Sequence, residues 1–192
     1  MLNNSYICEV IININLKHKD MLSSRLEAIM NEQIGKEAYS SNLYLAMASC
    51  AEFKGFEGIA NWFYAQAEEE HLHMLKFIRF INEKGGRAII PALEMPPTDF
   101  QDPNVAFATV LKHEMYITSS INEILYIAIE EKDFSSQNWL QWFVSEQTEE
   151  EAAVRRIIDK LNILGGQNLY LFDKDIMSLR APSGTTGAGA TV

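Results

Sequence analysis

The chain has 192 residues, which suits one domain with a sizeable core. Its hydrophobic content of 47% and charged content of 22% are ordinary for a soluble globular protein. No apolar run approaches the roughly 20 residues that span a bilayer. The net charge of -10 argues against nucleic acid and anionic membranes as partners and favours cations. The two cysteines, Cys8 and Cys50, form no pattern and indicate reduced thiols in a cytoplasmic protein.

The two ends of the chain differ from its middle. Residues 1–20 are apolar, but the first charge, Glu9, lies inside this stretch, no basic segment precedes it and no small-residue cleavage site follows. We therefore interpret residues 1–20 as an extension outside the fold rather than as a signal peptide. The Gly-, Ala- and Thr-rich residues 181–192 are predicted to be a disordered tail. The predicted domain spans residues 21–180.

Apolar residues at helical spacing predict two long helices in the first half of the chain. The first begins at a capping box, Ser24-x-x-Glu27, and ends near Gly55. The second runs over residues 57–84, where the pair Gly85-Gly86 stops it.

Two further long helices and a short one are predicted in the second half. Four prolines exclude a continuous helix over residues 87–103. Asp102-Pro103 is a cap followed by a proline at the first helical position, and the third helix extends to at least Ala128. The fourth starts near Ser135 and ends at Gly165-Gly166. A short fifth helix uses Phe172, Ile176 and Leu179.

Loop lengths predict the topology. The first and third links are short, so each joins two helices into an antiparallel hairpin. The middle link of about 17 residues can reach roughly 55 Å when extended, and a helix of about 28 residues is about 42 Å long. It can therefore run the length of the bundle. The expected fold is all-α: a four-helix bundle with one long crossover and a short fifth helix.

An internal repeat supports two related hairpins. A shift of 77 residues carries Glu37 onto Glu114 and Asn61-Trp62 onto Asn138-Trp139. The same shift carries Tyr39, Glu69, Glu70 and His73 onto Tyr116, Glu146, Gln147 and Glu150. Matched polar positions imply a pseudo-two-fold axis through the bundle. The three tryptophans, Trp62, Trp139 and Trp142, are expected in the core.

Each long helix carries a polar residue at mid-length on its apolar seam: Glu37, Glu70, Glu114 and Gln147. His73 and Glu150 follow three residues later on the same faces of their helices. Buried carboxylates without Lys or Arg on the same seams are costly unless a cation compensates them. Carboxylates with one imidazole suit iron in an open site, whereas zinc sites normally use more Cys or His.

Simpler interpretations exist for each residue alone. A single seam glutamate is more often solvated or paired, and a single buried histidine is more often only hydrogen-bonded. For the whole set, the alternative is a metal-free cluster that shares protons. Glu68 and Glu151 are expected on solvated faces. Tyr44, two turns after Glu37, is either a core aromatic or a neighbour of the site.

Several segments of the chain, from Met21 to about Leu179, resemble the non-haem bacterial ferritins. The residues that carry the resemblance include Glu37-Ala38-Tyr39-Ser40-Ser41-Asn42-Leu43-Tyr44, Glu69-Glu70-x-x-His73-Met74, Lys112-His113-Glu114 and Ser145-Glu146-Gln147-x-Glu149-Glu150-Glu151. The resemblance implies a shell of twenty-four subunits. It also implies a ferroxidase centre that oxidises Fe²⁺ with dioxygen or peroxide, so that ferric oxyhydroxide is stored inside the shell.

The resemblance also implies roles for individual residues. Glu37, Glu70 and His73 would hold the first iron of a di-iron centre. Glu70 would bridge to a second iron, held by Glu114 and assisted by Gln147 and Glu150. Tyr44 matches the tyrosine beside the centre. The residues that match a third iron site are Glu69, Glu146 and Glu149.

Departures from related patterns exclude other classes. Gln147-x-x-Glu150 stands where bacterioferritins keep a second Glu-x-x-His, and His71 rather than a methionine follows Glu70, so no haem is expected. A rubrerythrin-type oxidase or peroxidase would add a Cys-x-x-Cys iron site, which this chain lacks. The acidic charge and the complete ligand set within one chain argue against a DNA-coating miniferritin. We expect neither nucleic acid nor membrane as a partner.

Overall fold

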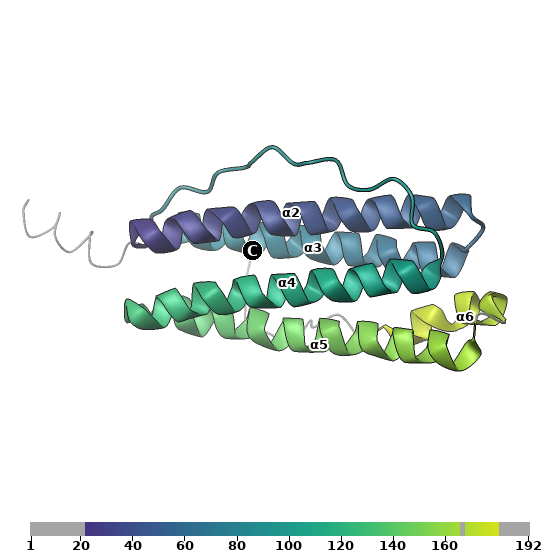
Figure 1. The fold of residues 1–192 in the computed structure, drawn as a ribbon. Helices are drawn as coiled ribbons and strands as arrows, with labels where there is room; N and C mark the ends of the chain where they lie inside the picture. The colour runs from purple at the N-terminus through teal and green to yellow at the C-terminus, as the bar shows by residue number, and fades with distance from the viewer. Residues whose placement is uncertain (1–21, 166–167, 181–192) are drawn as a thin grey trace, which may run out of the picture.

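The computed structural model describes residues 22–165 and 168–180. Four long helices form the bundle: α2 (Ser24–Phe53), α3 (Glu57–Glu83), α4 (Pro103–Glu130) and α5 (Phe134–Leu164). A short helix, α6 (Leu169–Asp175), continues into a 3-10 turn, η1 (Ile176–Leu179), at one end of the bundle (Figure 1). The predicted fold class is confirmed. Residues 1–20 and the tail 181–192 lie outside the described residues. No helix in the described ranges is both long and apolar enough to cross a membrane.

The helix starts agree with the sequence signals at α4 and differ at α2. The Asp102 carboxylate accepts hydrogen bonds from the N–H groups of Asn104 and Val105, with Pro103 as the first helical residue. The cap of α2 is Ser23, whose Oγ accepts from the N–H of Leu26 at 3.0 Å. The predicted capping box at Ser24 is therefore wrong by one residue.

The reason for that error is a tertiary contact of Glu27. Its carboxylate accepts from the N–H of Arg87 at 3.2 Å, and so ties α2 to the start of the crossover instead of closing a box at the cap. Helix α5 begins at Phe134, one residue earlier than Ser135, because Asp133 is its cap and accepts from the N–H of Ser136.

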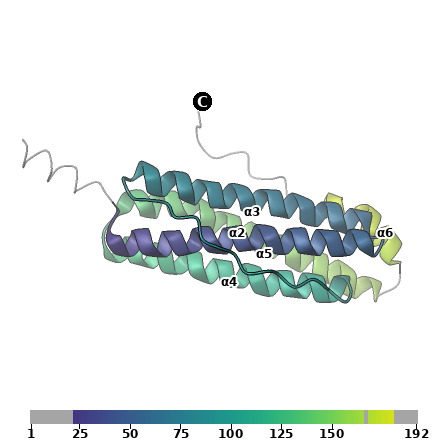
Figure 2. The same ribbon diagram turned by 90° about the horizontal axis from the view of Figure 1, so that it is seen from above.

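The segment between α3 and α4 runs along α2 for most of the bundle's length (Figures 1 and 2). Near its start, the Asn31 side chain accepts from the N–H of Ile89 at 2.7 Å and donates to the carbonyl of Arg87 at 3.1 Å. Near its end, Lys54 Nζ lies 2.8 Å from Asp99 Oδ1. Side-chain contacts from the first hairpin thus hold the crossover near both of its ends.

The apolar core is divided into two clusters. One lies toward α6 and includes Tyr44, Trp62, Phe63 and Phe107. The other lies toward the opposite end and includes Met30, Phe77, Ile121 and Phe143. Trp62 is buried, but Trp139 and Trp142, which were expected in the core, are only partly buried against the second cluster. The stretch between the clusters is polar on all four helices.

Helix α6 docks on the N-terminus of α3. The cap residue of α3, Phe56, offers no side-chain hydrogen bond. The Asp173 carboxylate supplies one instead, accepting from the N–H of Ile59 at 2.9 Å. A carboxylate at this end of a helix also matches the positive end of the helix dipole. Gly58 is required here, because a Cβ at this position would overlap the carbonyl of Asp173.

We expect Gly58→Ala to displace α6 and to lower the stability of the fold. The methyl group would meet main-chain atoms, which cannot rotate away, and such overpacking costs about 1–3 kcal/mol. Thermal unfolding followed by circular dichroism measures the loss. Glu68→Ala, on an exposed position of the same helix, is the control. Equal melting temperatures for the two variants would contradict the close α3–α6 contact.

Candidate metal centre

The polar stretch between the two core clusters holds six of the predicted site residues. Helix α2 supplies Glu37, α3 supplies Glu70 and His73, and α4 supplies Glu114. Helix α5 supplies Gln147 and Glu150. None of the six is more than 8% exposed. The spacing on each helix therefore places these side chains inside the bundle, at one level along its axis.

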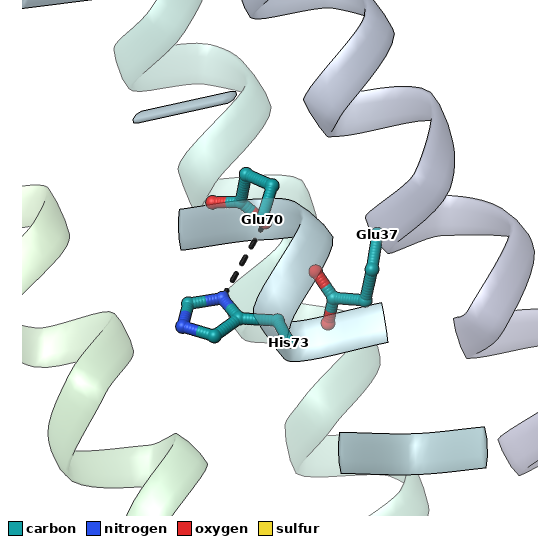
Figure 3. Close-up of side chains that lie close together, drawn as sticks. All are labelled: Glu37, Glu70 and His73. Carbon is teal, nitrogen blue, oxygen red and sulfur yellow. Dashed lines mark ion pairs between the residues drawn. The ribbon is translucent and has the colours of Figure 1, made fainter. Parts of the chain in front are cut away.

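Glu37, Glu70 and His73 form one candidate metal-binding group. Each offers one ligand atom, and these atoms all lie within 4.8 Å of one another. Figure 3 shows the Glu37 carboxylate and the His73 imidazole beside each other, with the Glu70 carboxylate facing the ring. His73 Nδ1 lies 3.5 Å from Glu70 Oε2.

Three atoms of this group have unused hydrogen-bonding capacity. Among the described residues, Glu37 Oε2, Glu70 Oε2 and His73 Nδ1 are buried and have no hydrogen-bond partner. Buried polar atoms are normally satisfied, and burying a carboxylate without compensation is costly. Three such atoms within one small volume fit a bound cation, and their mixture of oxygen and imidazole nitrogen fits iron.

Both carboxylate oxygens of Glu114, on α4, already accept hydrogen bonds from side chains. Tyr44 donates a hydrogen bond from its hydroxyl to Glu114 Oε1, and Gln147 Nε2 donates to Glu114 Oε2 at 3.1 Å. Tyr44 is also stacked on Phe63 in the first core cluster. It is therefore both a core aromatic and a neighbour of the centre.

A second acidic group lies next to the first. Glu69, Glu146 and Glu150 have ligand atoms within 4.8 Å of one another. His73 Nε2 is 4.0 Å from Glu146 Oε1, so the imidazole lies between the two groups. Glu149, which was expected at the third iron site, is exposed and does not belong to this group. Its neighbour Glu150 belongs to the group instead.

Two glutamines support the glutamates and carried no role in the sequence interpretation. Gln33 Nε2 donates to Glu37 Oε1 at 2.9 Å, and Gln66 Nε2 donates to Glu150 Oε2 at 2.9 Å. Each glutamine precedes a buried glutamate of its own helix by four residues, a spacing that puts them on one face. From this spacing the sequence could have predicted that both glutamines lie beside the buried glutamates.

Of the two glutamates expected on solvated faces, one is exposed and one is not. Glu68 is exposed on α3. The Glu151 side chain is only 14% exposed. It accepts a hydrogen bond from Thr118 at 2.6 Å and pairs with Arg155 four residues later. The expectation for Glu151 is therefore wrong, because α4 covers that side of α5.

Burial dominates the electrostatics of the centre. It raises the pKa of Glu37, Glu70 and Glu150 well above their ordinary value, and neighbouring negative charges raise them further. Burial also raises the pKa of Glu114, but the hydrogen bonds from Tyr44 and Gln147 oppose this shift. Without a cation, the cluster therefore retains protons, which a bound metal ion would displace.

Fold and site together define a four-helix bundle with a buried carboxylate–histidine cluster that could hold a metal ion. The family model described as Ferritin-like domain matches residues 27–164. This match covers most of the chain and all four bundle helices. The chain therefore belongs to the ferritin family.

Relatives of known name agree with this assignment. A Haemophilus influenzae protein described as a probable bacterial non-heme ferritin-like protein is 44% identical over 161 residues, which is 83% of this chain and 98% of that protein. The bacterial non-heme ferritin of Campylobacter jejuni is 38% identical over 161 residues, 83% of this chain and 96% of that protein. An open pore ferritin from Archaeoglobus fulgidus superposes with a TM-score of 0.80 at 41% identity, covering 83% of this chain and 98% of that one.

Proposed function

We propose that this protein is a cytoplasmic iron-storage ferritin that acts as a ferroxidase. It oxidises Fe²⁺ with dioxygen or peroxide and stores ferric oxyhydroxide inside a homo-oligomeric shell. The observation that carries the proposal is the group Glu37, Glu70 and His73, whose ligand atoms lie within 4.8 Å of one another and which holds three buried atoms without a hydrogen-bond partner among the described residues. Relatives named bacterial non-heme ferritin support it. The protein would need no haem and would bind neither nucleic acid nor a membrane.

The catalytic residues of the proposal are those that would touch or surround two iron ions. Glu37, Glu70 and His73 bind the first ion, and Glu70 also reaches the second. Glu114 and Glu150 bind the second, with Gln147 beside them. Tyr44 holds the Glu114 carboxylate through its hydroxyl. Glu69, Glu146 and Glu149 are proposed to serve a third iron, with Glu150 added because it lies within the same group.

Charge balance explains how such a centre favours oxidation. Four carboxylates, from Glu37, Glu70, Glu114 and Glu150, balance two Fe²⁺ ions. Each ion gives up one electron, and the pair reduces dioxygen to peroxide or peroxide to water. The ferric pair then carries about two positive charges in excess, which favours deprotonation of water bound to the metal. Two apolar core clusters flank the centre, and its four carboxylates are no more than 8% exposed.

The function is tested by adding Fe²⁺ to the assembled, metal-free protein in air. Ferric product should form rapidly, and the iron should migrate with the protein on a native gel stained for iron. A DNA-coating shell would instead retain plasmid DNA on the gel. Slow oxidation equal to that of a protein-free solution, with no iron on the protein band, would refute the proposal.

We predict a closed assembly of twenty-four subunits formed by the domain over residues 21–180. Light scattering at micromolar concentration should give this size. A variant that lacks residues 1–20 should assemble to the same size and oxidise iron at the same initial rate, because these residues precede the cap of α2. A particle no larger than a dimer would contradict the assembly. Loss of assembly in the truncated variant alone would show that the extension belongs to the fold.

A further inference from the structure

The residue that ends the described chain, Arg180, lies against the second acidic group. It follows η1 and packs on α3. One guanidinium nitrogen, Nη2, donates to Glu69 Oε2 at 2.5 Å and to the carbonyl of Ala65 at 3.2 Å. The Arg180 side chain is 22% exposed and that of Glu69 13%, so this ion pair is largely withdrawn from solvent. A cation thus already binds one of the three carboxylates of the Glu69–Glu146–Glu150 group.

Arg180 is also linked to Glu150 through the side chain of Gln66. Its Nε donates to Gln66 Oε1 at 3.2 Å, and Gln66 Nε2 donates to Glu150 Oε2 at 2.9 Å. An amide has one accepting end and one donating end. By binding the oxygen, Arg180 turns the NH₂ group of Gln66 toward Glu150. One guanidinium therefore neutralises Glu69 and orients a donor onto Glu150.

We propose that Arg180 is a tethered cation that holds the third metal position while no metal ion is there. This rests on the proposed function, since it gives the acidic group a metal to bind. An arginine stays charged in proteins, so Arg180 can leave the group only by moving away. A divalent ion at Glu69 would be repelled by the guanidinium at close range. Metal binding and the docking of Arg180 are therefore competitive.

Competition between Arg180 and a metal ion affects how readily the third position releases iron. The third position binds metal more weakly with Arg180 docked than without it, because displacing the guanidinium costs part of the binding free energy. An ion that arrives there is released more readily, and Arg180 returns to Glu69. The Glu37–Glu70–His73 group has no such competitor among the described residues, so its affinity is unaffected.

The test is an anaerobic titration of the assembled, metal-free protein with Co²⁺, followed calorimetrically and by visible absorption. Co²⁺ is bound without being oxidised, so the readout is affinity rather than activity. Arg180→Gln should bind the third ion about tenfold more tightly than the parent. Arg180→Lys, which keeps the charge, should stay close to the parent. Arg25→Gln is the matched control, since it removes the same charge from an exposed pair with Glu130.

One further variant makes the outcome specific. Arg180→Gln combined with Glu69→Gln should lose the gain in affinity, because the competing carboxylate is gone. Arg180→Gln that binds the third ion no more tightly than Arg25→Gln would overturn the proposal, and a lower melting temperature in that case would leave Arg180 a purely structural anchor of η1. Absence of Co²⁺ from the Glu37–Glu70–His73 group in the parent would instead contradict the proposed function.

Discussion

Glu70→Ala is expected to abolish the fast phase of Fe²⁺ oxidation. Glu70 is the only carboxylate proposed to touch both iron ions, and its buried Oε2 atom has no hydrogen-bond partner within the part of the chain that the structure describes. Even residues outside the ligand set of a metal site are typically worth 10–100-fold. We therefore expect the initial rate to fall by at least about 100-fold. Stopped-flow absorbance of the ferric product measures it.

The control for this experiment is Glu68→Ala. Glu68 is two residues away on the same helix and carries the same charge, but it is exposed. Its initial rate should equal that of the parent. If Glu70→Ala also oxidised iron at the parent rate, the ferroxidase centre would have to lie elsewhere.

Helix positions and topology were predictable because they depend on local chemistry. Asp102-Pro103 and the glycines after α3 and α5 mark helix ends through backbone geometry alone. The crossover follows from a length comparison between a loop and a helix. The start of α2 was missed because Ser23 and Ser24 are equally good caps, and the choice between them depends on Glu27 binding Arg87 on another segment.

The sequence predicted which candidate site residues are buried wherever the apolar face of a single helix determines this. Glu37, Glu70, His73 and Glu114 stand on seams whose apolar neighbours fix the buried side. Glu149 and Glu150 are adjacent, about 100° apart on α5. The apolar seam of α5 already placed Glu150 on the inward face, whereas Glu149 was assigned to the third site only through the family resemblance; in the structure Glu150 lies beside Glu69 and Glu149 is exposed. Arg180 carries no local signal, because its position depends on how α6 and η1 fold back onto α3.

The metal-free protein should lose stability as the pH rises, relative to a variant without the Glu70 charge. Burial raises the pKa of Glu70 well above the ordinary value of 4.5, and the charge of Glu114 raises it further. Below pH 4.5 both the folded and unfolded states carry the proton, so Glu70 imposes no ionisation cost. Above it, the unfolded chain ionises first and binds fewer protons, so the free energy of unfolding falls with pH until the folded group also ionises.

Glu70→Gln isolates this effect, because it removes the charge and keeps the shape. The melting temperatures of variant and parent, measured without metal, should converge below pH 4.5 and diverge above it, with the variant more stable. His113 acts with the opposite sign, since burial lowers its pKa to about 4 from the ordinary value of 6.5. Its contribution is present in both proteins and cancels in the difference.

Adding Co²⁺ should reverse the order. The ion replaces the protons of the parent's carboxylates and stabilises the folded state in proportion to its affinity. The variant has lost one ligand oxygen and should gain less. At neutral pH the parent should therefore melt below Glu70→Gln without metal and above it with metal. A parent that is the more stable protein at neutral pH in both conditions would show that Glu70 is satisfied by protein groups alone, and that no cation is needed to hold it in the core.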